Sequence, residues 1–424
     1  MIKLVRGFKD ILPADTPLWQ HVEAVVRQLL EDFGFAELRV PVLERTELFA
    51  RSIGAGTDIV EKEMYTFTDR GGASLSLRPE ATASVVRAYV EHRLYAKDPV
   101  CKLYTIGPMF RRERPQRGRY RQFHQINAEV FGLHDPRTDA ELILLLMTFM
   151  DRLALGGIAL NINSLGCPEC RPRFKKELKS FLSRRPEAFC SDCLRRKDEN
   201  PLRLFDCKVP ECREALQKAP SILDNLCEAC SVHFDEVKRS LDRFEIPYRI
   251  NNRLVRGLDY YTRTTFEVLA ESLGAQDAVA GGGRYDGLVK ALGGPNEPGV
   301  GFAVGMDRLM EILAKSAQDF GKRPDIFVAA IGETAQDLAF EWVQALRLRG
   351  IRAEMDVANR SLKSQMRRAD KFGAPYVVIV GDRELEEGMA IFRDMATKDQ
   401  EQIVLQEVVE TAVTRVRASA VGSA

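Results

Sequence analysis

The chain has 424 residues, of which 45% are hydrophobic and 29% charged, and its formal net charge is +1. This composition predicts a folded protein too long for one core, so we expect two or three domains. The near-zero charge argues against a general nucleic-acid coat protein. The longest apolar run, residues 142–150, is too short for a membrane span of roughly 18 residues, and the first residues lack the apolar core of a signal peptide. We therefore expect a cytoplasmic protein without membrane contact, whose nine cysteines are reduced or bound to metal.

The first expected elements are a helix over residues 18–33, where apolar residues recur at helical spacing, and a strand in FAELRVPVLE that runs to Pro41. Proline cannot donate to a sheet ladder, so Pro41 suits the edge or the end of a sheet. Further strands arrive mostly in succession, which predicts an antiparallel sheet. They are expected over residues 101–110, 125–133, 158–165, 254–270, 275–285 and 299–305, with helices over 138–154 and 306–316.

The pattern changes at Asp325, after which strands alternate with helices over residues 335–348 and 361–371. This alternation predicts a small α/β domain with a partly parallel sheet over residues 325–424, and it leaves residues 1–324 as a first domain. Within the first domain, residues 167–230 contain eight of the nine cysteines. We expect this segment to be a helical insertion between the two halves of the sheet.

Residues 110–124, FRRERPQRGRYRQFH, contain six arginines in a chain that is nearly neutral. The ordinary explanation is a solvated hairpin. Two features favour a function instead. The run is almost purely Arg, whose rigid guanidinium can bind phosphate through two hydrogen bonds. It also lies between two predicted strands, which would hold the loop on a rigid ladder.

Two further segments carry charge where a buried strand or a small-residue turn is expected. In LVRGLDYYTRTTFE, Arg256 and Asp259 interrupt an apolar strand, which indicates either a structural ion pair or a functional site. In GVGFAVGMDRLMEIL, small residues run into a helix whose first turn carries Asp307 and Arg308. The glycine spacing fits neither a dinucleotide fingerprint nor a phosphate loop. Any nucleotide would therefore be held by arginines on a sheet.

These segments resemble the motifs of class II aminoacyl-tRNA synthetases: the helix and strand ending at Pro41 are similar to motif 1, FRRERPQRGRYRQFHQ to motif 2 and GVGFAVGMDRL to motif 3. LVRGLDYYTRTTFE, GGGRYDGL, RGFKDILP and LRPEATAS further resemble the bacterial histidyl-tRNA synthetase family, although Ala81 stands where that family usually has glycine. The resemblance implies an α+β catalytic domain on a mixed, mainly antiparallel sheet, with a helical insertion and a C-terminal α/β anticodon-binding domain.

The resemblance implies that L-histidine is joined to its tRNA in two steps. Histidine and ATP, which brings Mg²⁺, form histidyl-adenylate and pyrophosphate, and the histidyl group then passes to the tRNA 3′ end. Arg111 matches the motif 2 arginine that holds the α-phosphate, and Arg308 the motif 3 arginine that stacks on adenine. Arg256 matches the family's own catalytic arginine. The alternative is a non-catalytic, synthetase-like regulatory subunit of ATP phosphoribosyltransferase, which lacks the C-terminal domain and has lost signature residues.

The resemblance also assigns the residues that recognise histidine. In that assignment Glu129 and Tyr261 contact the imidazole ring, and Glu80 and Thr82 hold the amino group. The full histidine-binding set is Glu80, Ala81, Thr82, Gln125, Glu129, Tyr260 and Tyr261.

Two basic surfaces are expected to contact tRNA. In the family the motif 2 loop meets the acceptor end of tRNA, which assigns Arg114 and Arg117 to that contact. In the C-terminal domain Arg367 lies on a basic helix face, which indicates either an RNA footprint or a solvated surface. Motif 1 further implies a homodimer.

The cysteines of the insertion form three C-x₂-C pairs and one C-x₄-C pair. They are Cys167 and Cys170, Cys190 and Cys193, Cys207 and Cys212, and Cys227 and Cys230. Two pairs make one tetrahedral zinc site, so the four pairs could build two sites, and three matchings are possible. The alternatives are reduced thiols packed as small hydrophobic residues, or a redox pair. Any metal is expected to be structural and distant from the arginines.

Overall fold

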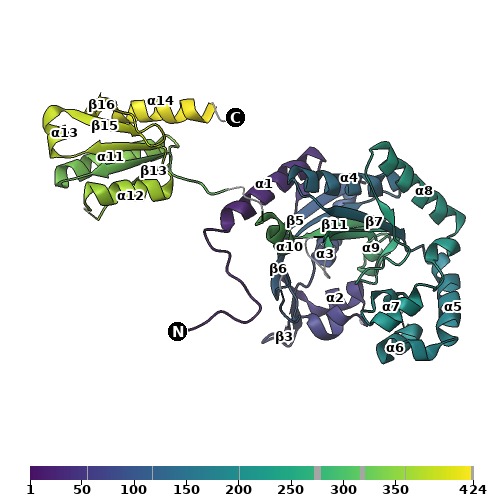
Figure 1. Ribbon diagram of the computed structural model, residues 1–424. Helices are drawn as coiled ribbons and strands as arrows, with labels where there is room; N and C mark the ends of the chain where they lie inside the picture. The colour runs from purple at the N-terminus through teal and green to yellow at the C-terminus, as the bar shows by residue number, and fades with distance from the viewer. Residues whose placement is uncertain are drawn as a thin grey trace. The chain divides into compact units, whose positions relative to one another are not determined.

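The computed structural model describes residues 1–54, 56–116, 118–199, 201–271, 278–315, 320–358 and 360–421. The chain forms two compact units, Met1–Asp319 and Phe320–Ala424 (Figure 1). Among the helices of these described residues, none is long and apolar enough to cross a membrane.

The described part of the larger unit is built on an eight-stranded sheet in the order β1-β5-β6-β11-β10-β9-β7-β8. The six central strands are antiparallel to their neighbours, and only the edge strands β1 and β8 pair in parallel. The strands are β1 (Ala36–Glu37), β5 (Cys101–Phe110), β6 (Gln122–Phe131), β7 (Ile158–Ser164), β8 (Arg249–Ile250), β9 (Thr262–Ala270), β10 (Ala278–Arg284) and β11 (Gly299–Gly305). This arrangement confirms the predicted mixed, mainly antiparallel sheet.

One face of the sheet carries the main hydrophobic core. Figure 1 shows long helices lying across this face. The helices that contribute to this core are α1 (Thr16–Asp32), α4 (Pro136–Arg152), α8 (Glu228–Arg243) and α10 (Met306–Leu313). Because side chains alternate along a strand, Ala128 and Val130 of β6 enter this core while Glu129 between them faces the other side. On β9, Phe266 and Val268 do the same on either side of Glu267.

A fully buried ion pair joins the sheet to these helices. Arg284 of β10 binds the carboxylate of Asp139 on α4, and His233 of α8 bonds the same carboxylate at 2.8 Å. Arg284 also donates to the carbonyl oxygen of Leu133 at 2.8 Å. Burying charges is costly unless each finds partners, so this network requires β10, α4 and α8 to keep one mutual arrangement.

The opposite face of the sheet is covered by shorter elements. They are α2 (Thr46–Ile53), α3 (Thr82–Glu91), α9 (Leu288–Ala291) and a small sheet of β2 (Leu43–Arg45), β3 (Thr66–Thr68) and β4 (Ser74–Leu77). Val85, Val86 and Tyr89 of α3 pack with Phe131 of β6 in a second core. Polar side chains that project from the sheet on this side therefore lie between the sheet and these elements.

Two predicted strands differ from the structure. The strand expected over residues 254–270 begins only at Thr262, and in the loop before it the carbonyl oxygen of Gly257 accepts from Arg203 of the insertion at 2.6 Å. The strand expected to run to Pro41 is shortened to β1, which ends at Glu37, and β2 begins only after Pro41, in a different sheet. Proline has no N–H for the ladder, and the chain changes sheets there. Residues 275–277 and 316, which were included in predicted elements, lie outside the described residues.

The cysteine-rich segment is helical, as predicted, and connects β7 to α8. Its helices are α5 (Cys170–Ser183), α6 (Ser191–Glu199) and α7 (Pro210–Leu216), with a 3₁₀ segment η4 (Pro201–Asp206) between α6 and α7. The insertion has a small core of its own, which includes Phe174, Leu178 and Leu204.

The smaller unit is a five-stranded sheet in the order β13-β12-β14-β15-β16. Its strands are β12 (Ile326–Ala330), β13 (Ala353–Met355), β14 (Tyr376–Val380), β15 (Met389–Asp394) and β16 (Gln400–Val404), and its helices are α11 (Glu333–Leu348), α12 (Leu362–Phe372), α13 (Asp382–Glu387) and α14 (Val408–Val421). The first three strands are parallel and the last two antiparallel, so the partly parallel sheet is confirmed. β15, β16 and the last two helices were not predicted.

Candidate active site

Three arginines from distant parts of the chain line one cavity of about 420 Å³ in the larger unit. Arg111 follows the end of β5, Arg256 lies in the loop before β9, and Arg308 is in the first turn of α10. These three cations were predicted from the sequence to act on one triphosphate. The fold brings all three to the lining of one cavity.

Arg111 is held in place by the backbone and by a ring. Its Nε donates to the carbonyl oxygen of Pro79 at 2.9 Å, and its guanidinium lies 5.3 Å from the centre of the Phe123 ring. Glu113 of the same loop is 3.9 Å from Nη1 of Arg111 and 2.8 Å from Nη1 of Arg119. Arg111 can therefore offer its outer nitrogen atoms to a ligand without changing its position.

Arg256 lies flat against the sheet. Its Nη1 donates to Glu267 of β9 at 2.6 Å, and its guanidinium lies 5.9 Å from the centre of the Tyr261 ring. A Cβ atom at Gly281 of β10 would come within 2.5 Å of the guanidinium nitrogens, so only glycine leaves room for it there. Burial would lower the pKa of Arg256, but Tyr261 and Glu267 raise it above the ordinary value. The cation thus persists in a largely buried position.

Arg308 is fixed by two backbone carbonyl groups. It donates to the oxygen of Ala278 and, at 3.4 Å, to that of Gly118. Burial lowers the pKa of Arg308, and the neighbouring cation of Arg119 lowers it further. The described lining of this cavity carries five basic and four acidic side chains, and this small excess of positive charge favours an anionic ligand.

A second group of polar side chains lies on the same face of the sheet. Glu129 of β6 accepts a hydrogen bond from Thr82 at 2.7 Å and another from the hydroxyl of Tyr285. Gly301 of the neighbouring strand β11 lies beneath this carboxylate, and a Cβ atom there would overlap its oxygen. Both carboxylate oxygens of Glu129 are thus held by hydrogen bonds in a buried position on this face of the sheet.

Glu80 has a second role that the sequence did not reveal. Its two carboxylate oxygens accept from the backbone N–H groups of Thr82 and Ala83 at 2.8 and 2.9 Å, so it caps the start of α3. Ala81 occupies the N-cap position of that helix and is buried. Burial raises the pKa of Glu80 in spite of these hydrogen bonds.

The remaining expected histidine contacts lie between the two groups. The Tyr260 and Tyr261 rings are 4.7 Å apart, Tyr260 is 5.7 Å from the Tyr285 ring, and burial raises the pKa of all three. Gln125 of β6 lines the arginine cavity, and its buried Oε1 has no hydrogen-bond partner among the described residues. An unpaired buried acceptor of this kind is suited to a ligand N–H group.

The expected tRNA contacts are only partly placed by the structure. Arg114 is exposed in the motif 2 loop, and Arg117 lies outside the described residues. In the smaller unit Arg367 is exposed on α12, where Lys363 and Lys371 are also exposed one turn before and after it. Residues at this spacing share one helix face, so α12 presents a basic stripe.

Sequence reasoning missed the part that the insertion takes in this site. Asp206 and Lys208 line the arginine cavity, and Arg203 pairs with Asp259 of the signature loop at 3.2 Å. A larger adjoining cavity of about 910 Å³ is lined by Arg256 together with Cys190 and Cys207. Where a bound metal would lie relative to the arginines stays a prediction, although Cys190 and Cys207 line a cavity that Arg256 also lines. Among the missed residues, only Glu267 could have been noticed in the sequence, because it is a charged residue between apolar residues of a predicted strand.

Glu129 generates a prediction about stability. Burial raises the pKa of this carboxyl from about 4.5 to about 8, although the Tyr285 and Thr82 hydrogen bonds oppose the shift. The folded state therefore keeps a proton that the unfolded state releases. The contribution of this bound proton to the free energy of unfolding is complete below pH about 4.5 and is lost as the pH rises to about 8. Relative to Glu129→Gln, the free energy of unfolding should fall by up to about 1.4 kcal/mol per pH unit in this window.

Urea unfolding at several pH values between 5 and 8 measures this difference. The chain has two tryptophans, so Trp342→Phe in the smaller unit leaves buried Trp19 as the fluorescence reporter of the larger one. Glu31→Gln at the exposed end of α1 is the control. Parallel stability profiles for the parent and Glu129→Gln would contradict the prediction.

Comparison with known proteins agrees with this geometry. Residues 7–309 match the family model described as histidyl-tRNA synthetase, and residues 325–415 match that of the anticodon binding domain. The chain is 58% identical over 405 residues to the histidine–tRNA ligase of Desulfatibacillum aliphaticivorans, covering 96% of this chain and 97% of that protein. It is 56% identical over 416 residues to that of Desulfosudis oleivorans, covering 98% of each.

The structure is also similar to the crystal structure of apo S. aureus histidyl-tRNA synthetase, with a TM-score of 0.83 and 37% identity over 97% of this chain and 99% of that one. The match therefore extends over the sheet with its three arginines, the insertion and the smaller unit. The chain belongs to the histidyl-tRNA synthetase family of class II aminoacyl-tRNA synthetases.

Proposed function

We propose that this chain ligates L-histidine to its cognate tRNA, using ATP. The observation that carries the proposal is the convergence of Arg111, Arg256 and Arg308 on one cavity, on the same face of the sheet as the buried carboxyl of Glu129. Histidine and ATP with a divalent cation are the substrates of the first step, which yields histidyl-adenylate and pyrophosphate. The histidyl group is transferred to the tRNA 3′ end in the second step.

Histidine recognition rests on the buried polar groups around Glu129. The carboxyl of Glu129 accepts an imidazole N–H, and the ring of Tyr261 forms the adjacent wall. Glu80 and Thr82, at the start of α3 next to Ala81, receive the amino group, with Gln125 and Tyr260 nearby. A site of this kind rejects apolar side chains, because they would leave its buried polar groups without partners.

Activation is a displacement at phosphorus. The histidine carboxylate, which is ionised and needs no general base, attacks the α-phosphorus of ATP, and the bond to pyrophosphate breaks. Negative charge accumulates on the α-phosphate oxygens in the transition state, where Arg111 and Arg256 stabilise it with fixed positions and no reorganisation. Arg308 stacks its guanidinium on adenine, and the divalent cation that accompanies ATP screens the phosphates.

The two units take separate roles in this proposal. Residues 1–324 form the catalytic domain with the insertion 167–230, and residues 325–424 form the anticodon-binding domain. Arg114 and Arg117 of the motif 2 loop contact the acceptor end of the tRNA, and Arg367 on the basic stripe of α12 contacts the anticodon region. The insertion also holds structural zinc.

The alternative, a regulatory subunit of ATP phosphoribosyltransferase, is less well supported. Such a subunit lacks the anticodon-binding domain, and that domain model matches residues 325–415 of this chain. The relatives that are 52–58% identical over nearly the whole chain are histidine–tRNA ligases. Arg111, Arg256 and Arg308 are all present.

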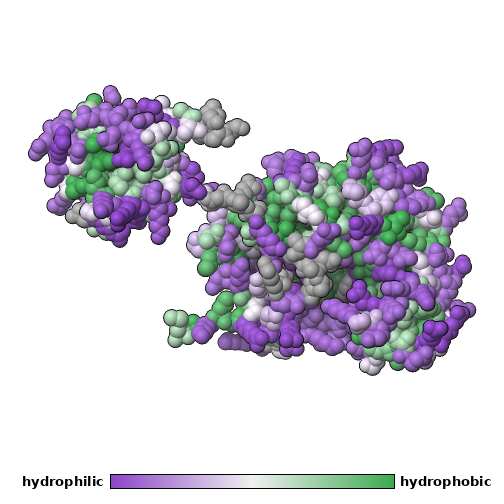
Figure 2. Space-filling view, viewed as in Figure 1, coloured by the Kyte–Doolittle hydropathy of each residue, from purple (hydrophilic) through white to green (hydrophobic). Residues whose placement is uncertain are grey.

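We further propose a homodimer. Exposed apolar side chains gather on the extended N-terminal segment in Figure 2, where Ile2, Leu4 and Val5 are exposed. Leu43 of β2 and Phe67 of β3 are exposed as well. Apolar surface of this kind often marks a protein interface.

The first prediction from the proposed function tests the reaction. Histidine alone should support rapid exchange between ATP and pyrophosphate in a panel of amino acids. Arg256→Ala should lower kcat by roughly 10²-fold or more and raise the KM for ATP far less, because its contact strengthens in the transition state. Arg137→Ala, an exposed arginine at the start of α4, is the control. Equal exchange with a second amino acid would refute the assignment.

The second prediction separates the two tRNA surfaces. Arg114→Ala should slow transfer to tRNA and spare pyrophosphate exchange. Arg367→Ala should weaken tRNA binding and reduce its salt dependence by about one phosphate contact. Arg383→Ala, an exposed arginine elsewhere in the smaller unit, is the control. The division of roles is wrong if both variants lose pyrophosphate exchange in the absence of tRNA.

The third prediction concerns assembly. Sedimentation at working concentrations should give twice the chain mass of 47.8 kDa. Replacing exposed Phe67 by serine should shift the equilibrium toward monomer, and the same change at exposed Phe340 in the smaller unit is the control. A fully active monomer would refute the homodimer.

A further inference from the structure

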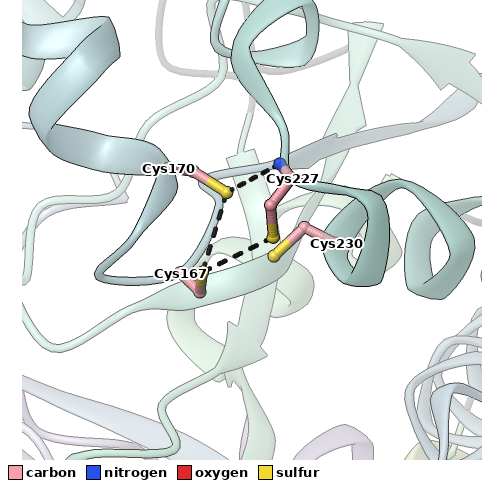
Figure 3. A group of neighbouring side chains, drawn as sticks. All are labelled: Cys167, Cys170, Cys227 and Cys230. Atoms are coloured by element: carbon pink, nitrogen blue, oxygen red, sulfur yellow. Dashed lines mark hydrogen bonds between the residues drawn. The ribbon is translucent and has the colours of Figure 1, made fainter.

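The eight cysteines of the insertion gather in two separate groups of four. The outer group is Cys167, Cys170, Cys227 and Cys230, and the inner group is Cys190, Cys193, Cys207 and Cys212. Within each group the sulfur atoms lie within 4.8 Å of one another. Figure 3 shows the outer group, in which the turn before α5 and the start of α8 point their thiols toward one another. The fold thus selects one of the three possible matchings of the pairs.

The distances between sulfur atoms fit a metal site. Cys167 lies 3.6 Å from Cys170 and 3.8 Å from Cys227, and Cys190 lies 3.9 Å from Cys207. With zinc–sulfur bonds of about 2.3 Å, the corners of a tetrahedral thiolate site are about 3.8 Å apart. A disulfide would require about 2.05 Å. Both groups therefore have the size of a tetrahedral site.

The backbone supplies hydrogen bonds that favour thiolates in both groups. The N–H of Cys227 donates to the sulfur of Cys170 at 3.1 Å, and that of Cys190 donates to Cys212 at 3.2 Å. Cys227 is the N-cap of α8 and Cys170 begins α5, so the outer group also lies at two helix N-termini. Helix N-termini and N–H donors stabilise negative charge, and such outer contacts orient metal ligands.

We infer that the insertion binds two zinc ions, one in the outer group and one in the inner group, each through four cysteine thiolates. Tetrahedral sites made only of thiolates suit Zn²⁺, and four protein ligands leave no open position for catalysis. Both ions are therefore structural, and each stabilises a different part of the insertion.

The outer site joins the insertion to the catalytic sheet. Cys167 follows β7 closely, and the Leu165 N–H and Gly166 carbonyl continue the pairing with Arg263 at 2.7 and 2.9 Å. Next to Cys170, Arg171 donates to the carbonyl oxygens of Leu165, at 3.2 Å, and Tyr261. Its cation also offsets the net negative charge of a zinc–tetrathiolate group. Arg171 is thus a positioning residue that connects the outer zinc site to Tyr261, whose ring forms one wall of the proposed histidine site.

The inner site holds the part of the insertion that lines the arginine cavity. Cys193 and Cys212 are buried in the core of the insertion, and Cys207 directly follows η4. The end of η4 carries Asp206, and Lys208 follows Cys207, so both cavity-lining residues adjoin one zinc ligand. The inner zinc therefore stabilises this wall together with the small apolar core and the contacts of Arg203 with Gly257 and Asp259.

Zinc analysis of the purified full-length chain tests the number and the matching of the sites. The parent, prepared with zinc and with reduced thiols, should contain two zinc ions per chain. After dialysis against a chelator that the parent withstands, Cys167→Ser with Cys227→Ser should retain one ion, and Cys167→Ser with Cys190→Ser should retain none. If the pair that contains Cys167 instead shares a site with the pair that contains Cys190, these two results are reversed. If it shares a site with the pair that contains Cys207, neither variant retains zinc. Cys101→Ser, in β5, is the control and should keep two.

A measurement on the unmodified chain covers the case in which a double variant fails to fold. Partial zinc release followed by alkylation and mass spectrometry should expose cysteines in the two groups of four, and X-ray absorption should show four sulfur ligands per zinc. One zinc per chain or less, iron in its place, or oxygen ligands would overturn the inference.

The role of the outer site is tested separately, and this step rests on the proposed function. Cys167→Ser with Cys227→Ser should raise the KM for histidine about tenfold through Arg171 and Tyr261, and change the KM for ATP less than about threefold. Arg171→Ala should reproduce this shift while keeping both zinc ions. An unchanged KM for histidine in the one-zinc variant would overturn the positioning role. Failure of histidine-dependent exchange in the parent would instead refute the proposed function, whatever the zinc content.

Discussion

The candidate site depends on the close approach of charged side chains to the glycines of two adjacent strands. Gly281 of β10 leaves room for the guanidinium of Arg256, and Gly301 of β11 leaves room for the carboxyl of Glu129. Any larger residue at either position would place its Cβ atom where the charged group lies. The flat backbone therefore serves as the floor of the site, and its rigidity fixes the cation and the acceptor before any ligand arrives.

This constraint requires the two faces of one sheet to differ. The helix face is apolar and is tied together by the Arg284–Asp139 pair, whereas the other face carries Glu129, Glu267 and the arginine cavity. Strand alternation places these charges between residues of the main core, so the packing that stabilises the sheet also positions the chemistry. The buried carboxyl of Glu129, whose pKa is raised to about 8, shows what that position costs in stability at neutral pH.

The insertion completes the site from the outside. Arg203 reaches the signature loop at Gly257 and Asp259, and Asp206 enters the cavity that contains Arg256. A segment with so small a core needs additional constraints to hold these positions, which two tetrahedral thiolate groups would supply. A segment far from the motifs along the chain thus contacts the loop that carries Arg256.

The fold class and the mainly antiparallel sheet could be predicted from the sequence alone, because alternation and motif spacing are local properties. Three features were decided only by the tertiary structure. Arg203 donates to the carbonyl oxygen of Gly257, Asp206 and Lys208 line the arginine cavity, and the first cysteine pair of the insertion meets the last one. Each joins residues that are tens of positions apart, and such contacts depend on how the insertion folds back onto the sheet, which no local pattern records.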